Sequence, residues 1–267
     1  MSAPRPVTLI TGASAGIGSA LAEVFAQNGH ELVLAARRAP EMERLADKLA
    51  ASGALRPTVL SLDLAQANAG DRLAAELAAR GLTPRNVVNN AGFGLIGPAA
   101  ELDRAAQLAM IDLNVRTLTD LSLAFIPSLA EQRGGILNVA SVAGFLSGPG
   151  MAVYYATKAF VLSFSEALNV ELAPRDIRVT VLCPGPVPTE FQARAGIERR
   201  RSIMDRGVEE VAQAGYDGLM SGRRVVVPGW QNRFVTRIPR FLPRGLLLEL
   251  VGRSQSHRHH TRIAPGS

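Results

Sequence analysis

The chain has 267 residues, 47% of them hydrophobic, which is enough to bury one α/β core without a second domain. Its single cysteine, Cys183, excludes an internal disulfide, fits a reducing cytoplasm and is expected to be buried at a strand end. The net charge of +6 comes without a paired Cys/His finger or an aromatic RNP pattern, so we expect no nucleic-acid partner.

Short apolar, β-branched runs alternate along the chain with helix-like stretches. The runs are continuously apolar, as in strands that are covered on both faces. Strands are expected over residues 7–11, 31–36, 58–62, 86–89, 135–140, 177–183 and 224–227. Strand–helix alternation with right-handed crossovers predicts an α/β fold, a Rossmann-like doubly wound sheet of about seven parallel strands with helices on both faces.

Three of the intervening helices have clear ends. Helices are expected over residues 17–28, 40–51 and 153–172. Gly29 is expected to end the first, because a left-handed residue after a helix is easiest for glycine. Pro174 is expected to stop the third, because proline cannot continue a helix. No linker, internal repeat or low-complexity block divides the chain.

A glycine-rich turn follows the first expected strand, in the string TGASAGIG over residues 11–18. Residues without a Cβ let backbone N–H groups and a helix N-terminus approach a pyrophosphate. The spacing is neither the general GxGxxG fingerprint nor a P-loop, and by itself it also fits an ordinary turn. The expected cofactor contacts here are Gly12, Ser14, Gly16, Ile17 and Gly18.

The second strand ends in Ala36, Arg37 and Arg38, where an acid would bind the ribose 2′-hydroxyl of NAD. A guanidinium instead suits a 2′-phosphate, so the two arginines favour NADP(H) over a merely solvated strand end. Asp63 and Leu64 follow the third strand, where an adenine would lie. A turn or helix-capping aspartate is the alternative for Asp63.

Tyr154 and Lys158 are four residues apart and share one face of the third helix. A phenol has a pKa near 10, and a nearby ammonium favours its ionised form, so Lys158 is a candidate to lower the pKa of Tyr154. Ser141, at the end of the fifth strand, is a candidate to hydrogen-bond a substrate carbonyl. A YxxxK string is weak alone, but its order after the glycine turn, the NNAG of residues 89–92 and Ser141 makes it specific.

These motifs, in this order, resemble those of the short-chain dehydrogenase/reductase family in its compact single-domain branch. The resemblance covers about residues 5–230 and includes DLNV at 112–115, YYATK at 154–158 and PGPVPT at 184–189. It implies that Tyr154 is the general acid in reduction and the base in oxidation, while Lys158 lowers its pKa and holds the nicotinamide ribose. It also implies that Ser141 positions the carbonyl and that Asn114 orders a proton-relaying water.

The resemblance assigns further residues to the cofactor. Asn90, Ala91 and Gly92 are implied to line it, and residues 184–189 to cover the nicotinamide. The contacts expected from the latter segment are Pro184, Gly185, Val187 and Thr189. Tyr155 has the wrong offset from Lys158 and is expected to pack.

Apolar residues near the motif ends suggest a pocket for a hydrophobic ketone or secondary alcohol. They are Phe93, Leu95, Phe145, Leu146, Phe191 and Ile197. Each of them fits a place in the core at least as well. The substrate class is therefore left as carbonyl, steroid or 3-oxoacyl compounds.

Residues 1–230 are expected to form the NAD(P)-binding Rossmann-like catalytic domain, and 231–267 a basic amphipathic extension and polar tail. Apolar residues and arginines alternate there, and Pro239 and Pro243 argue against one long helix. Such a segment could lie on a membrane surface or cap the cleft. Packing on the domain or on a second subunit is favoured. His257, His259 and His260 are expected to lie in a disordered tail, and no metal site is expected.

The sequence thus predicts an NADP(H)-dependent oxidoreductase that transfers hydride between the nicotinamide and a hydrophobic carbonyl or alcohol. An NAD(P)+-dependent alcohol dehydrogenase and a non-catalytic dinucleotide-binding scaffold remain as alternatives, and the intact Asn114, Ser141, Tyr154 and Lys158 speak against the scaffold. The family resemblance implies a homo-oligomer built through helix faces that include residues 153–172, and we expect a cytoplasmic location. We expect no secretory signal. We also expect no membrane span, because no apolar run reaches the roughly 20 residues that a span needs.

Overall fold

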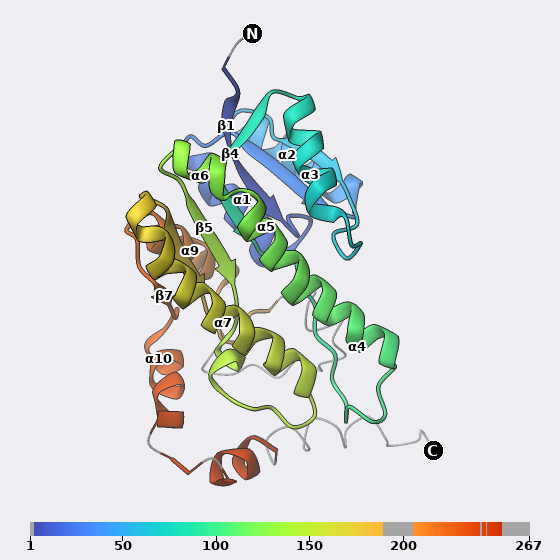
Figure 1. Cartoon of the computed structure of the whole chain (residues 1–267), viewed down its shortest axis with the longest axis vertical. Coiled ribbons are helices and arrows are strands. Elements are labelled where there is room, and N and C mark those ends of the chain that lie inside the picture. The colour runs from blue at the N-terminus through green and yellow to red at the C-terminus, as the bar shows by residue number, and fades with distance from the viewer. Residues whose placement is uncertain (1–2, 189–204, 241, 244, 253–267) are drawn as a thin grey trace.

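The computed structural model describes residues 3–188, 205–240, 242–243 and 245–252, and its centre is a seven-stranded parallel sheet (Figure 1). The strand order is β3-β2-β1-β4-β5-β6-β7, so the chain returns from the β3 edge to the centre at β4. The strands are β1 (Arg5–Thr11), β2 (Leu32–Ala36), β3 (Thr58–Ser61), β4 (Leu82–Asn89), β5 (Gly135–Val139), β6 (Arg178–Leu182) and β7 (Val225–Val226). The expected doubly wound fold is confirmed.

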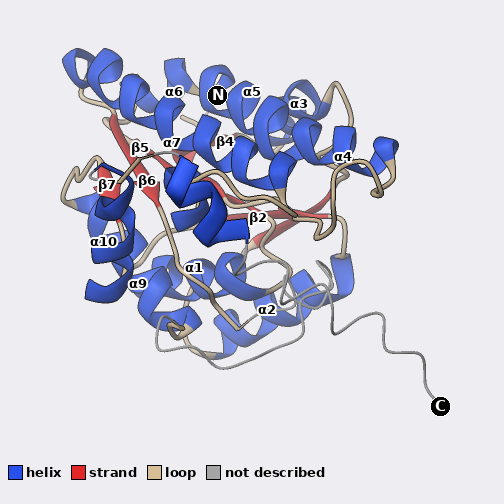
Figure 2. Ribbon diagram, turned by 90° about the horizontal axis from the view of Figure 1, so that it is seen from below, coloured by secondary structure: helices blue, strands red, loops and turns tan. Residues whose placement is uncertain are grey.

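Helices cover both faces of the sheet, which Figure 2 shows edge-on. One layer consists of α1 (Gly16–Gln27), α2 (Ala39–Ala51) and α9 (Val208–Met220). The other consists of α3 (Ala69–Ala79), α4 (Arg104–Ile111), α5 (Leu118–Ala124), α6 (Ile126–Glu131) and α7 (Ala152–Leu172). Short 3-10 turns occupy Val142–Phe145, Ala173–Arg175 and Ile238–Arg240, and α10 (Trp230–Arg237) follows β7.

One apolar core lies on each side of the sheet, as the continuously apolar strands require. Phe25, Leu21 and Met42 are fully buried on the α1–α2–α9 side. Leu73 and Leu121 are buried to the same extent on the other side. Every residue of β2 and of β5 is buried.

The expected helix ends are also found. Gly29 follows α1 with a φ of +77°, the left-handed conformation that favours glycine. Helix α7 ends at Leu172, and Pro174 lies in the 3-10 turn that follows. Among the described helices, none combines the length and the apolar character that crossing a membrane requires.

Two strands begin earlier than expected: β1 by two residues, at Arg5, and β4 by four. Strand β4 starts at Leu82 and not at Asn86, although it contains Pro84, which has no N–H to donate. The register against β1 shifts at this point: Val7 pairs with Pro84, and Thr8 pairs with Asn86. An irregularity at Arg85 therefore accommodates the proline inside the strand.

All the strands point the same way, so their carboxyl ends share one edge of the sheet. Three of the predicted site segments begin directly after a strand: Gly12 after β1, Arg37 after β2 and Asn90 after β4. A fourth, at Pro184, begins two residues after the end of β6. Strands β1 and β4 are neighbours where the strand order reverses. Ligands of doubly wound sheets bind beyond the strand ends at this reversal.

Candidate active site

The glycine turn after β1 has the geometry of an anion-binding site. Gly12 and Gly16 have φ values of +66° and +59°, which residues with a Cβ rarely adopt. Helix α1 begins at Gly16, and its N-cap residue Ala15 provides no side-chain hydrogen bond to the first turn. The first-turn N–H groups and the positive end of the helix dipole thus lie at the turn, and they fit a pyrophosphate.

Thr11 and Asn90 join this turn to the NNAG segment. The Asn90 Nδ2 donates to the carbonyl oxygens of Thr11 at 3.0 Å and of Gly12 at 3.2 Å. In return the Thr11 Oγ1 accepts from the backbone N–H groups of Asn90, at 3.0 Å, and of Ala91, at 3.1 Å. A Cβ on Gly18 would lie only 2.3 Å from the Gly12 carbonyl oxygen, so glycine is required there. Sequence reasoning missed the role of Thr11, although it is buried at a strand end beside the motif.

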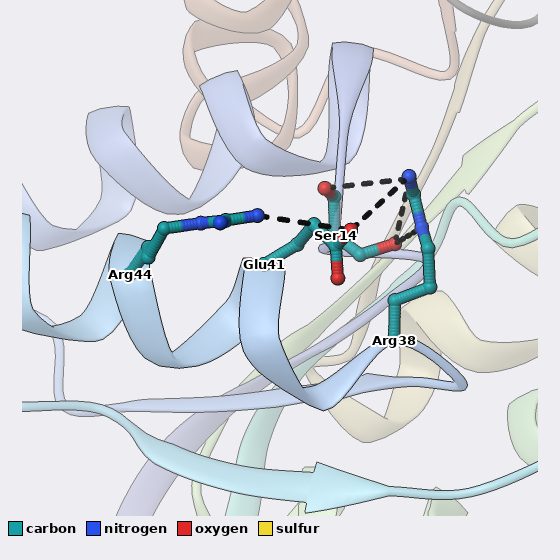
Figure 3. Close-up of polar contacts among 4 residues, drawn as sticks. All are labelled: Ser14, Arg38, Glu41 and Arg44. Carbon is teal, nitrogen blue, oxygen red and sulfur yellow. Dashed lines mark hydrogen bonds and ion pairs between the residues drawn. The ribbon is translucent and has the colours of Figure 1, made fainter.

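The two arginines after β2 take different positions. Arg37 is exposed, whereas Arg38 lies across the glycine turn and donates from Nη2 to the Ser14 Oγ at 3.2 Å (Figure 3). The Arg38 Nε lies 3.3 Å from the same oxygen. Glu41 lies between Arg38 and Arg44, with its Oε1 3.7 Å from a guanidinium nitrogen of each. The structure therefore brings Arg38, and not Arg37, to the turn.

The remaining residues predicted for the adenine side are placed unevenly. The Asp63 Oδ1 accepts from the Ala65 N–H at 3.1 Å, which is the turn geometry left open as an alternative. The Leu64 side chain is buried in the core, and its carbonyl oxygen accepts from the Thr117 hydroxyl at 2.6 Å. Ile17 is half-buried against the α1–α2–α9 core. Leu64 can thus offer its backbone to a ligand but not its side chain.

Ser141, Tyr154 and Lys158 come together beyond β5. Ser141 is the N-cap residue of the 3-10 turn Val142–Phe145, and its Oγ accepts from the Ala143 N–H at 3.1 Å. A side-chain hydrogen bond joins Ser141 to Tyr154. The Lys158 Nζ lies 5.9 Å from the centroid of the Tyr154 ring and donates to the Val139 carbonyl oxygen at 2.9 Å. The predicted cluster of hydroxyl, phenol and ammonium is therefore present.

Asn114 approaches this cluster from a π-helical turn (Asp112–Thr117) between α4 and α5. Its Nδ2 donates to the Phe93 carbonyl oxygen at 2.9 Å and to the Thr157 Oγ1 at 3.1 Å. Thr157 donates in turn to the Tyr154 carbonyl oxygen at 2.7 Å. A Cβ on Gly92 would lie 2.8 Å from the Asn114 Oδ1, so this glycine permits the close approach. The π-helical turn was not indicated by the sequence, and such turns are frequent at functional sites.

Burial shifts the pKa values of both titrating side chains. It raises the pKa of Tyr154 to about 12, and the hydrogen bond from Ser141 opposes this rise. Burial also lowers the pKa of Lys158 to about 8. The sequence predicted that Lys158 lowers the pKa of Tyr154, whereas burial raises it and the Lys158 ammonium donates to the Val139 carbonyl oxygen.

The segment after β6 borders the same edge. Pro184 and Val187 are buried, and a Cβ on Gly185 would lie 2.5 Å from the side chain of Asn232 on α10. The Pro184 carbonyl oxygen accepts from the Val142 N–H at 2.9 Å, which ties this segment to the turn after Ser141. Thr189, Phe191 and Ile197 lie outside the described residues.

Apolar side chains surround the Tyr154 ring. Tyr154 belongs to a small cluster with Ile96, Met110 and Met151, against which Phe93 and Leu95 pack. Tyr155 packs in the same cluster, as expected, and its ring leaves no room for a Cβ on Gly148. Phe145 instead packs on a different cluster, and Leu146 is half-buried. Of the expected substrate-facing residues that the structure describes, Phe93 and Leu95 are thus the ones beside the phenol.

Known proteins resemble this chain in sequence and in overall fold. Residues 6–200 match the family of short chain dehydrogenases. Sulfoacetaldehyde reductase 2 of Chromohalobacter salexigens is 38% identical over 188 residues, which cover 69% of this chain and 74% of that protein.

Two solved structures extend the likeness. A short-chain dehydrogenase from Sphingobium yanoikuyae in complex with NADPH is 32% identical, covers 98% of both chains and superposes with a TM-score of 0.76. A short chain dehydrogenase/reductase from Burkholderia phymatum in complex with NAD is 25% identical, with a TM-score of 0.78 over 89% of this chain and 93% of that one.

Proposed function

The chain belongs to the short-chain dehydrogenase family and is an oxidoreductase that uses a nicotinamide dinucleotide, and within that family we propose that it is an NADP(H)-dependent reductase of hydrophobic ketones. The observation that carries the proposal is the hydrogen bond between Ser141 and Tyr154 beside the buried Lys158. This group lies at the same sheet edge as a glycine turn that fits a pyrophosphate.

Reduction of a carbonyl needs a hydride and a proton donor. When bound, the nicotinamide supplies the hydride that reduces the carbonyl carbon. Tyr154 then donates its proton to the carbonyl oxygen, and Ser141 holds that oxygen by a hydrogen bond. Because burial raises the pKa of Tyr154 to about 12, the phenol is protonated near neutral pH, as a general acid must be.

The chain itself offers a route by which the proton is replaced. Lys158 holds a titratable ammonium in the same buried cluster, and its pKa is lowered to about 8. Asn114 and Lys158 both lie beside Gly92, and hydrogen bonds hold the Asn114 amide to Phe93 and Thr157. We assign Lys158 to the nicotinamide ribose and to proton supply, and Asn114 to the ordering of a water between Lys158 and solvent.

The preference for NADP(H) rests on Arg38. Its guanidinium lies on Ser14 of the glycine turn, next to the end of β2 where the adenosine ribose of a dinucleotide lies in this fold. A planar guanidinium matches a 2′-phosphate, and no acid occupies the end of β2 to bind a 2′-hydroxyl. Arg37 adds positive charge from a more exposed position.

The substrate class rests on the surroundings of Tyr154. Phe93, Leu95 and Met151 place apolar surface beside the phenol, which favours a hydrophobic carbonyl compound. The homo-oligomer remains part of the proposal, because α7 carries Phe160 and Val170 with 40% and 63% of their surfaces exposed. A cytoplasmic location remains part of it as well.

Paired fluorescence titrations with NADPH and NADH test the proposal first. We expect tight binding of NADPH and weak binding of NADH, followed by oxidation of NADPH with apolar ketones such as 3-oxoacyl esters and steroid ketones. Tighter binding of NADH would contradict the assignment of Arg38. Binding of neither dinucleotide would contradict the assignment as an oxidoreductase and would favour a protein that keeps the fold without the activity.

A further inference from the structure

Helix α10 presents a stripe of aromatic and basic side chains to solvent. Trp230 and Phe234 are 71% and 65% exposed. Arg233 and Arg237 are exposed beside them, at the three- and four-residue spacings that share one helix face. Because large apolar side chains rarely gather on a surface that faces only water, this stripe indicates a partner.

The stripe is held in place by the opposite side of α10. Asn232 is fully buried there, donates from Nδ2 to the Pro228 carbonyl oxygen at 2.9 Å and packs against Gly185. Thr236 is also buried and donates to the Arg233 carbonyl oxygen at 3.0 Å. The outward direction of the stripe is thus set by packing against the segment that follows β6.

A second helical segment, residues 245–252, lies at the same end of the molecule as α10. Leu246 and Leu250, one turn apart, are 46% and 50% exposed. The segment reaches the loop before α7, because a Cβ on Gly252 would lie 3.7 Å from Pro149. Figure 1 shows α10 and residues 245–252 at the lower end of the molecule, toward which the strands point. We call Trp230, Arg233, Phe234, Arg237, Leu246 and Leu250 the C-terminal face.

Charge is distributed very unevenly between this part of the sequence and the rest. Residues 218–267 contain nine arginines and one acid, Glu249, a net charge of +8. The whole chain carries +6, so residues 1–217 carry −2. The net positive charge of the protein therefore comes from the part of the sequence that contains the exposed aromatic residues.

We propose that the C-terminal face docks the protein on an anionic lipid surface. Arginine side chains are attracted to lipid phosphates, and tryptophan and other aromatic rings bind at the interface between headgroups and acyl chains. The attachment is peripheral, since no described helix crosses a bilayer. A second copy is a poor occupant, because a two-fold interface through this face would bring Arg233 and Arg237 against their own counterparts.

Docking in this way would place the catalytic end of the molecule at the membrane. Gly185, which packs on Asn232, belongs to the segment tied to the turn after Ser141. If the proposed function holds, an apolar ketone dissolved in the bilayer would reach the site without crossing water. This consequence rests on the proposed function, whereas the docking itself does not.

The test is binding of the full-length protein to vesicles of phosphatidylcholine alone and of phosphatidylcholine with 30% phosphatidylglycerol. Trp230 is the single tryptophan of the chain, so its emission reports contact directly. We expect sedimentation with the anionic vesicles, a blue shift of the emission, and loss of both as salt is raised from 50 to 500 mM. Neither readout requires cofactor or turnover, so failure here is distinct from failure of the proposed function.

Matched variants decide which residues are responsible. The double variant Arg233→Gln, Arg237→Gln should weaken anionic-vesicle binding roughly 30-fold, since each basic residue near such a surface contributes about a factor of five. Arg72→Gln, Arg80→Gln removes two exposed arginines at α3 and should have no such effect. Phe234→Ser should remove most of the blue shift, whereas Leu55→Ser, at a residue 64% exposed elsewhere, should not.

Three results would overturn the proposal. They are no binding to either vesicle, equal binding to neutral and anionic vesicles, and equal losses in the Arg233/Arg237 and Arg72/Arg80 variants. Size-exclusion chromatography of Phe234→Ser tests the alternative that a second copy of the chain binds to the C-terminal face. A smaller oligomer with vesicle binding unchanged would show that the face binds a second copy and not lipid.

Discussion

The Nζ of Lys158 donates to the carbonyl oxygen of Val139 at 2.9 Å, and the lysine is buried, with 6% of its surface exposed. Burial lowers the pKa of this ammonium to about 8 from the ordinary 10.5. The same burial raises the pKa of Tyr154. Burial thus places the pKa of the phenol above that of the ammonium, the reverse of their ordinary order. Such shifted pKa values are common at sites of proton transfer.

The free energy of unfolding should depend on pH through the titration of Lys158. Between pH 8 and 10.5 the unfolded chain keeps a proton on this lysine that the folded chain has lost, so stability rises with pH in that window. Relative to Lys158→Met, which cannot titrate, the free energy of unfolding of the parent should rise by on the order of 2 kcal/mol from pH 7 to 9.5. Urea unfolding of both proteins measures the difference, and a constant difference would contradict the assignment.

Tyr154→Phe should abolish turnover, because it removes the hydroxyl that donates the proton and leaves the ring in its apolar cluster. The affinity for NADPH should change little. Tyr155→Phe is the control, since Tyr155 packs beside it on the same helix, and this variant should keep most of the activity. Substantial activity in Tyr154→Phe would contradict the assignment of Tyr154 as the general acid. Equal activity of the parent and both variants would mean that another group donates the proton.

Arg38→Gln should weaken NADPH binding roughly 10- to 100-fold, the worth of a charged hydrogen bond, with little effect on NADH. Arg37→Gln should have a clearly smaller effect, since that side chain is exposed and Arg38 is the one on Ser14. Titration of both variants with both dinucleotides provides the comparison. A larger loss in Arg37→Gln would reverse the roles, and equal losses of NADPH and NADH in Arg38→Gln would show that the arginine does not bind the 2′-phosphate.

Thr11→Val should lower the free energy of unfolding by about 1–3 kcal/mol, because in a half-buried place the Ala91 N–H loses its acceptor and the Asn90 N–H keeps only the Val88 carbonyl oxygen, at 3.2 Å. Cofactor affinity should fall with it, since the bonds of Asn90 fix the glycine turn. Thr58→Val, in the half-buried strand β3, is the control, as valine suits a strand and no such network is removed. Unchanged stability and affinity in Thr11→Val would argue against the network.

Much of this protein was determined locally by its sequence. The apolar runs predicted the seven strands, and Gly29 and Pro174 predicted two helix ends, because these features depend on a few neighbouring residues. The motif order then predicted one site, since the carboxyl ends of parallel strands share an edge. The largest error was the start of β4, because the irregularity that accommodates Pro84 depends on pairing with β1.

Other properties depended on contacts between distant segments. Arg37 and Arg38 are equivalent in the sequence, and only the approach of β2 to the glycine turn brings Arg38 to Ser14. The spacing of Tyr154 and Lys158 suggested a lowered phenol pKa, but the packing around them determines desolvation, and desolvation raises it. The outward stripe of α10 likewise follows from burial of Asn232 against Gly185. Periodicity and motif order are local, whereas burial and electrostatics are sums over the folded chain, so only the tertiary structure decided them.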